Sequence, residues 1–252
     1  MGWVEAALII GAAALAGALN VLVGGGSLIT YPTLLALGHP PVLANVSNNL
    51  GMIPGNAAGV LAYRPLLAGQ RSSLLALLPA SLLGGLSGAI LLLALPAKLF
   101  AAVVPLLIAL ASVLMALQPR IKAWIERRRG SRQATGLPLL AGVYFAGVYG
   151  GYFGAAQGVL LLAVMAVGLD EGLQRLNGFK NALVLIVNAT AALVFIGFTR
   201  VEWRVAALIA VGTAAGGWLG GRYGRRIPEP LLRRTIVVTG LVVAAVLALR
   251  LR

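Results

Sequence analysis

The chain contains long runs of residues without a single charge. Between Arg71 and Lys98 every residue is uncharged, and most are Leu, Ala or Gly. About 20 apolar residues let an α-helix cross the hydrocarbon core of a bilayer. Over the whole chain 60% of residues are hydrophobic and 10% charged, whereas soluble domains carry roughly 25% charged residues. The sequence predicts an all-α integral membrane protein and argues against a soluble enzyme or a secreted disulfide-bonded domain.

Two of the predicted apolar segments, 27–37 and 159–169, are too short to span a bilayer alone. Each follows a glycine-rich break, at 24–26 and at 150–158. Backbone groups freed by a break within the bilayer need protein or cavity partners, and paired breaks of this kind are typical of transport sites. Each break with its short segment therefore favours a re-entrant helix pair, and the alternative is that both segments cross the membrane. The ten predicted segments are 3–23, 27–37, 42–63, 72–95, 97–117, 137–153, 159–169, 173–198, 205–221 and 231–249.

The two halves of the chain align without gaps at an offset of 132 residues. The second half contains three asparagines, and each falls on an asparagine of the first half. This indicates a duplication, with a first repeat at 1–117, a basic loop at 118–135 and a second repeat at 136–252. The matching pairs are Asn45 with Asn177, Asn49 with Asn181, Asn56 with Asn188, Gly84 with Gly216, Gly85 with Gly217 and Gly88 with Gly220.

The basic residues predict how the halves sit in the membrane. The net charge of +14 comes from residues between apolar segments, which fits the positive-inside rule and not nucleic-acid binding. The rule places the loop 118–135 and the basic stretch 222–226 in the cytoplasm. With both regions in the cytoplasm, each repeat crosses the membrane an odd number of times, and the two repeats have inverted topology. Each repeat would then contain three membrane helices besides the re-entrant pair. The expected location is the plasma or inner membrane.

Polar residues form one stripe on each of two predicted helices. At 3.6 residues per turn, Asn45 and Asn49 project within about 40° of each other, and Asn48 lies beside them. The second repeat carries Lys180 in place of Asn48. Polar side chains inside a membrane protein face the bundle interior or a cavity. The alternatives are amides that only link helices and a lysine that reaches the membrane surface.

The predicted half-helices place positive dipole ends and free N–H groups next to these stripes, an arrangement that favours an anion. Backbone amides, asparagine amides and a lysine are all donors, and the chain lacks the intramembrane acids of a cation site. The pattern therefore predicts a midplane site for a small oxyanion. The predicted binding residues are Gly24, Gly25, Gly26, Ser27, Asn45, Asn48, Asn49, Gly154, Gln157, Gly158, Asn177, Lys180 and Asn181.

Catalysis and cofactor binding have little support in the sequence. The chain has no cysteine and a single histidine, His39, so it offers no thiolate or histidine metal cluster. It also lacks a nucleophile–base pair and a phosphate-binding G-x-x-x-x-G-K-[ST] motif. We therefore expect no enzyme activity, metal or cofactor, and transport driven by a gradient or by facilitated flow. The coupling ion, either H⁺ or Na⁺ if there is one, and homo-oligomer formation stay open.

The chain resembles a known family at two places. The stretch 17–56 contains the glycine break, Leu-Gly-His-Pro-Pro and Ala-Asn-Val-Ser-Asn, and is similar to the sulfite exporter TauE/SafE family. Residues 150–161 and 176–181 resemble the second repeat of that family. The resemblance implies a prokaryotic plasma-membrane permease for sulfur-containing anions such as sulfite, thiosulfate or organosulfonates. Gln157 stands where relatives often carry a small residue, a departure that bears on the substrate.

Together the residues and the resemblance predict a secondary transporter that exports a small sulfur-containing anion by alternating access. Its partners would be the anion and the lipid bilayer, with no nucleic acid. Two other functions fit the same apolar sequence. One is an anion channel with the same lining, and the other is a membrane protein with a purely structural role, whose small residues only pack helices.

Overall fold

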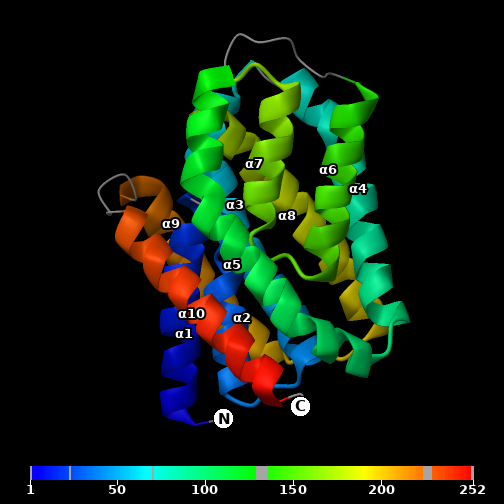
Figure 1. Ribbon diagram of the computed structural model, residues 1–252, viewed down its shortest axis with the longest axis vertical. Helices are drawn as coiled ribbons and strands as arrows, with labels where there is room; N and C mark the ends of the chain where they lie inside the picture. Colours follow the sequence, from blue (N-terminus) through cyan, green and yellow to red (C-terminus); the bar gives the residue numbers. More distant parts are fainter. Residues whose placement is uncertain (1, 23, 70, 129–135, 224–228, 251–252) are drawn as a thin grey trace.

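The computed structural model is all-helical (Figure 1) and describes residues 2–22, 24–69, 71–128, 136–223 and 229–250. Within these ranges the chain forms ten α-helices, one short 3-10 helix and no β-strand. The helices are α1 (Trp3–Leu22), α2 (Ser27–Ala36), α3 (Pro41–Tyr63), η1 (Arg64–Leu67), α4 (Arg71–Ala94), α5 (Ala97–Arg128), α6 (Leu137–Tyr152), α7 (Gln157–Gly168), α8 (Leu173–Phe198), α9 (Trp203–Tyr223) and α10 (Glu229–Arg250).

The predicted all-α membrane class is confirmed. Four helices, α1, α4, α5 and α8, are long and apolar enough by length and composition to cross a membrane. The two segments predicted to be short are short in the structure, because α2 has 10 residues and α7 has 12. Helix order also repeats: a long helix and a short helix precede three longer ones in each half of the chain.

One boundary differs from the prediction. The predicted loop 118–135 begins as helix, because α5 continues without interruption through Arg128. Residues 118–128 are rich in helix-forming side chains, and Ile125 is buried against a hydrophobic cluster that also contains Leu77 and Leu176. Apolar packing therefore extends the helix beyond the uncharged segment. Residues 129–135 and 224–228, which hold several of the basic residues used to orient the chain, lie outside the described residues.

The short helices belong to two hairpins that enter the molecule from opposite ends. In Figure 1, α1 rises from the end where both termini lie, whereas α6 descends from the opposite end. The connections α1–α2 and α6–α7 therefore meet near the middle. Their backbones touch there, because a Cβ placed on Gly24 would lie 2.9 Å from Cα of Gly158. Glycine at both positions permits this tip-to-tip contact, and Gly24 also has a left-handed φ of 88°.

The two halves of the chain are exchanged in the packing. Helix α9 of the second half packs most extensively on α1 and α3, whereas α4 of the first half packs on α6 and α8. The aligned glycines make both contacts close. A Cβ on Gly216 would overlap the carbonyl oxygen of Ala14, and one on Gly84 would overlap that of Tyr144. Two bundles result: a first bundle of α1, α2, α3 and α9, and a second bundle of α4, α6, α7 and α8.

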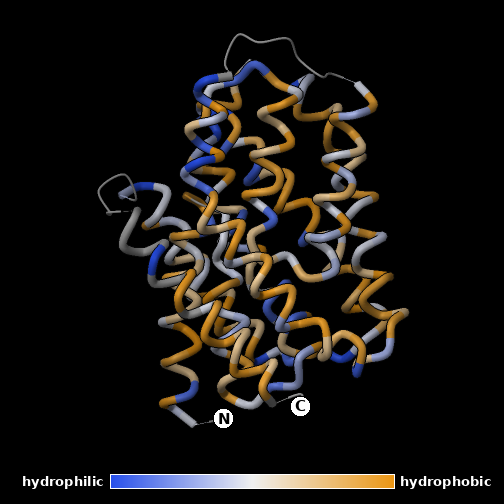
Figure 2. The backbone as a smooth tube through the Cα atoms, viewed as in Figure 1, coloured by the Kyte–Doolittle hydropathy of each residue, from blue (hydrophilic) through white to orange (hydrophobic). Residues whose placement is uncertain are grey.

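Hydropathy separates the surface from the interior of this arrangement. Figure 2 shows hydrophobic residues along the outer helices and hydrophilic residues at the ends of the molecule, with further hydrophilic positions inside. Large apolar side chains such as Leu106, Leu193 and Val211 are exposed, as expected for a lipid-facing surface. The interior polar residues lie mainly on α3 and α8, which face each other across the boundary between the two bundles.

Candidate functional site

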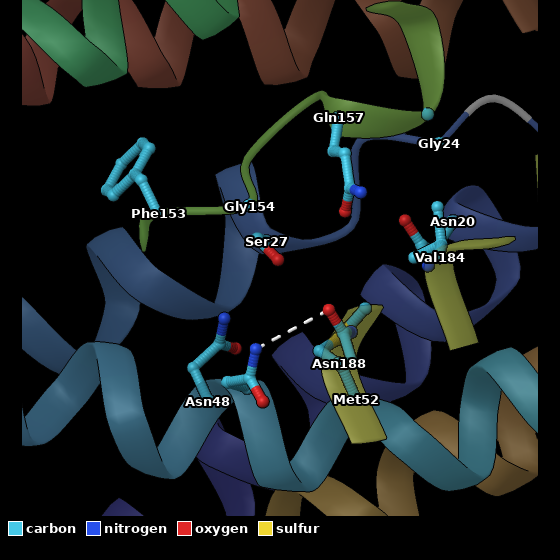
Figure 3. Close-up of a pocket in the computed structure, with 12 residues that line it drawn as sticks. Asn20, Gly24, Ser27, Asn48, Met52, Phe153, Gly154, Gln157, Val184 and Asn188 are labelled. Carbon is cyan, nitrogen blue, oxygen red and sulfur yellow. Dashed lines mark hydrogen bonds between the residues drawn. The ribbon is translucent and has the colours of Figure 1, made fainter. Parts of the chain in front are cut away.

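A small cavity lies where the two hairpin tips meet α3 and α8 (Figure 3). The volume open to the centre of a water-sized sphere is about 10 Å³, which is at the lower limit for holding one water molecule. The cavity is therefore nearly closed in this conformation. Its lining residues come from both halves of the chain: Asn20, Gly24, Ser27, Asn48, Asn49, Met52, Phe153, Gly154, Gln157, Gly158, Val184 and Asn188.

Asparagine amides link the helices below the tips. The Nδ2 of Asn49 on α3 donates to the Oδ1 of Asn188 on α8 at 3.4 Å, as drawn in Figure 3. The hydroxyl of Thr30 donates to the Oδ1 of Asn48. The backbone N–H of Gly26 donates to the Oδ1 of Asn20 at 3.3 Å. The predicted asparagine stripes thus contribute both to interhelical bonds and to the cavity wall.

Gln157 is the most unusual residue of the wall. It is 1% exposed, and both its Oε1 and its Nε2 are buried without a hydrogen-bond partner. Its side chain points into the cavity (Figure 3) and passes close to Gly150, where a Cβ would collide with it. An unpaired buried amide costs free energy. The Oδ1 of Asn49, also on the cavity wall, is likewise buried without a partner.

Lys180 lies beside the cavity and is not among its lining residues. It is 1% exposed, and its Nζ donates to the carbonyl oxygens of Asn20 at 3.0 Å and Val21 at 3.2 Å. These carbonyls belong to the last turn of α1, where the orphan acceptors and the negative end of the helix dipole favour a cation. The aliphatic part of Lys180 lies against Gly24 and Gly158. The ammonium group therefore caps the broken helix at the first hairpin tip.

The second hairpin tip is capped by an amide. The Nδ2 of Asn45 on α3 donates to the carbonyl oxygen of Tyr152, the last residue of α6, at 3.0 Å. Tyr152 stands 132 residues after Asn20, so the two capped carbonyls occupy matching positions of the repeats. Each capping side chain comes from the other half of the chain. The same carbonyl of Val21 that binds Lys180 also accepts from the Nδ2 of Asn181, at 3.4 Å.

The structure thus divides the predicted site residues into two groups. Seven line the cavity: Gly24, Ser27, Asn48, Asn49, Gly154, Gln157 and Gly158. The other six do not line it: Gly25, Gly26, Asn45, Asn177, Lys180 and Asn181. Of these, Gly26, Asn45, Lys180 and Asn181 form hydrogen bonds at the hairpin tips, whereas Asn177 is buried on α8 with its Oδ1 unpaired.

Sequence reasoning left out several residues of the wall. Asn188 was aligned with Asn56 as part of the repeat, and that match could have placed it at the site. Asn20 is an amide in the otherwise apolar helix α1, a signal that could also have been used. Met52 and Val184 carry no sequence signal that separates them from other apolar residues.

His39 lies away from this cavity, at the turn between α2 and α3. Its Nδ1 is 2.7 Å from a carboxylate oxygen of Glu202, and its Nε2 is 3.4 Å from one of Glu5. Among the described residues no group of three or more acidic, histidine or cysteine side chains is arranged to hold a metal ion. The cluster connects the start of α1 with the start of α9.

The sequence of the chain matches a known protein family. The family model for sulfite exporter TauE/SafE matches residues 9–247, nearly the whole chain. The chain belongs to the TauE/SafE family. It is thus a multi-pass membrane protein of a transporter family, as the apolar helices and the resemblance predicted.

Three relatives of this TauE/SafE protein are described as membrane transporters. The "Probable membrane transporter protein ORF9" of Sinorhizobium sp is 28% identical over 95% of this chain and 89% of its own length. The "Probable membrane transporter protein YfcA" of Escherichia coli K12 is 27% identical, covering 92% and 86%. A "Probable membrane transporter protein" of Haemophilus influenzae is 23% identical, covering 90% and 88%. No solved structure matches the chain significantly.

Proposed function

We propose that this TauE/SafE protein is a secondary transporter that exports a small sulfur-containing anion, such as sulfite, thiosulfate or an organosulfonate. The observation that carries the proposal is Gln157, a buried amide with both polar atoms unpaired and pointing into the cavity between the hairpin tips. A buried polar group without a partner is expected where a ligand supplies the missing hydrogen bonds.

The ends of two helices support an anion as the ligand. Helix α2 begins at Ser27 and α7 begins at Gln157, and both residues line the cavity. Each helix N-terminus carries about half a positive elementary charge. No carboxylate is among the residues that line the cavity. A small oxyanion would meet amide donors from both halves of the chain.

Transport requires the cavity to open, because its volume of about 10 Å³ is too small for an oxyanion. We propose that the first bundle (α1, α2, α3 and α9) and the second bundle (α4, α6, α7 and α8) move against each other. The moving units would be these two bundles and not the two halves of the sequence, because α9 and α4 are each packed closely on the opposite half. The sites of opening would be the contact between the tips and the α3–α8 boundary.

A counterflow measurement in proteoliposomes tests the proposal. Vesicles loaded with unlabelled sulfite should accumulate labelled sulfite transiently, and methanesulfonate should compete. Flux that does not saturate and shows no counterflow would indicate the channel alternative. Absence of any flux from verified folded protein would indicate the structural role and overturn the proposal.

We further propose inverted repeats in the plasma membrane, with residues 118–135 on the cytoplasmic side. Single cysteines at positions 67 and 127 should then react with an impermeant reagent only from the cytoplasm, and one at position 201 only from outside. Reaction of positions 67 and 201 from the same side would contradict this topology. The coupling ion and the oligomeric state can be read from the same vesicles by imposing H⁺ or Na⁺ gradients and by cross-linking.

A further inference from the structure

We infer that the cavity accepts its oxyanion in the singly charged form and rejects the doubly charged form, so that thiosulfate, which is doubly charged near neutral pH, leaves the set of candidate anions. The inference rests on the proposed function and concerns the same cavity. It follows from the charges around the cavity and from the kind of polar groups in its wall.

Charge comes first. The N-termini of α2 and α7 together carry about one positive elementary charge, and the C-termini of α1 and α6 at the same tips carry about one negative charge. Lys180 adds one positive charge through its ammonium group, and it is the one charged side chain among the buried residues that the structure describes. The surroundings of the cavity therefore have about one net positive charge. A singly charged anion is balanced there, and a doubly charged one is not.

Desolvation increases the difference. The cost of moving an ion from water into a low-dielectric interior grows with the square of its charge, and it is recovered only where opposite charge and hydrogen bonds are at hand. Lys180 already directs its ammonium group to the carbonyls of Asn20 and Val21. No cationic side chain is among the residues that line the cavity. A doubly charged anion would keep one charge uncompensated.

The wall also offers acceptors. The Oε1 of Gln157 and the Oδ1 of Asn49 are buried and unpaired. A fully deprotonated oxyanion can only accept hydrogen bonds, so it would leave these two oxygens unpaired next to its own negative charge. A protonated oxyanion has an O–H group that can donate to one of them. For sulfite this is hydrogen sulfite.

One consequence concerns coupling. If hydrogen sulfite is the transported form, each sulfite leaves with one proton, and the protein needs no proton-carrying side chain in its interior. This agrees with the absence of carboxylates among the buried residues of the described part. Proton movement would then follow the substrate's own protonation.

The test compares two anions with the same tetrahedral sulfur and different charge. Methanesulfonate has one negative charge and sulfate has two throughout the range around neutral pH. Both are fully deprotonated there and can only accept hydrogen bonds, so the comparison isolates the effect of charge. In proteoliposomes with equal pH on both sides, methanesulfonate should compete with labelled sulfite at least tenfold better than sulfate. Sulfite counterflow should rise as pH falls and hydrogen sulfite accumulates, while competition by methanesulfonate, corrected for sulfite protonation, stays unchanged. Equal competition by sulfate, or sulfite counterflow that rises with pH, would overturn the inference. Either result would still agree with the proposed transport function.

A second arm changes the protein. Gln157→Glu keeps the size of the side chain and adds a negative charge to the cavity, so it should reduce counterflow and methanesulfonate competition at least tenfold at neutral pH. Gln174→Glu makes the same chemical change at an exposed position and should leave both unchanged. Wild-type flux in folded Gln157→Glu protein would contradict the inference. Complete lack of counterflow in the wild type would overturn the proposed function itself, and with it this inference.

Discussion

The free carbonyl groups at the two hairpin tips are bound by different side chains. Each tip interrupts a helix inside the molecule and leaves carbonyl groups that need donors. At the first tip, the ammonium group of Lys180 binds the carbonyl of Asn20, and at the second, the amide of Asn45 binds the matching carbonyl of Tyr152. A charged donor on one side and a neutral donor on the other leave the cavity with an excess of positive charge.

The tips also differ in what they present to the cavity. Position 25 of the first tip and position 157 of the second correspond at the repeat offset. Gly25 carries no side chain, and the terminal methyl group of Met115 of α5 occupies the space where its Cβ would lie. Gln157 fills the space beside Gly150 and points into the cavity. A near-symmetric backbone therefore carries an asymmetric binding surface.

The largest effect is expected where the helices within each bundle pack closely on each other. Gly216→Ala places a Cβ on the backbone carbonyl of Ala14, and Gly84→Ala does the same at Tyr144. Overpacking against backbone typically costs about 1–3 kcal/mol or more, so both variants should lose folded protein or several degrees of melting temperature. Size-exclusion and thermal unfolding in detergent would measure this.

Gly11→Ala is the matched control, because nothing lies within 4 Å of a Cβ at Gly11 in α1. It should be neutral or slightly stabilising, since alanine favours a helix over glycine by about 1 kcal/mol. If Gly216→Ala is tolerated as well as Gly11→Ala, the close α1–α9 contact is wrong.

The next effect separates the two capping side chains. Lys180→Met removes a charged donor from two carbonyls, and hydrogen bonds to charged groups contribute about 1.5–3 kcal/mol. Asn45→Leu removes a neutral donor, which contributes about 0.5–1.5 kcal/mol. The melting temperature should therefore fall further for Lys180→Met. Equal falls in melting temperature would show that the two capping side chains stabilise their tips to the same extent, and would contradict the difference between the tips.

Replacement of Gln157 should raise the stability of the protein and lower its flux, whereas replacement of a residue that only stabilises the fold lowers its stability. Gln157→Leu removes two unpaired buried polar atoms, so the free energy of unfolding should rise by about 1–3 kcal/mol. Counterflow should fall at least tenfold, because the cavity loses its free hydrogen-bonding groups. Thermal unfolding and counterflow on the same preparation would measure both. Lower stability with unchanged flux would place Gln157 in the packing alone.

The smallest effect concerns the outer turns of the hairpins, where His39 and Glu171 are repeat counterparts. Glu171 pairs with Arg175 at 3.0 Å, but the Arg175 side chain is 48% exposed. Arg175→Ala should cost only about 0.3–0.5 kcal/mol, as is usual for an exposed i,i+4 pair. His39→Ala removes a mostly buried group that lies 2.7 Å from a carboxylate oxygen of Glu202 and should cost more. Chemical denaturation of the two variants side by side would show whether this order is right.

Much of the fold could be predicted from the sequence, because its determinants are local. Uncharged stretches such as the one between Arg71 and Lys98 require a bilayer, and the glycine breaks end two helices early. The short helices α2 and α7 were predicted at nearly their observed positions. The site was predicted only in part: seven of the thirteen predicted residues line the cavity. Lys180 caps α1 beside the cavity, and its predicted contact with an anion stays a prediction.

The sequence by itself determined that the chain is a helical membrane protein, that its two halves are related, and that polar residues gather at two broken helices. Hydropathy, glycine content and periodicity are properties of neighbouring residues, and they decide these points. Only the tertiary structure decided that α4 and α9 are exchanged between the halves and that Gln157, not Lys180, faces the cavity. Both depend on contacts between residues 60 or more positions apart, such as Gly84 with Tyr144. In such contacts, close glycine surfaces and unsatisfied carbonyls on one helix select the partner from another.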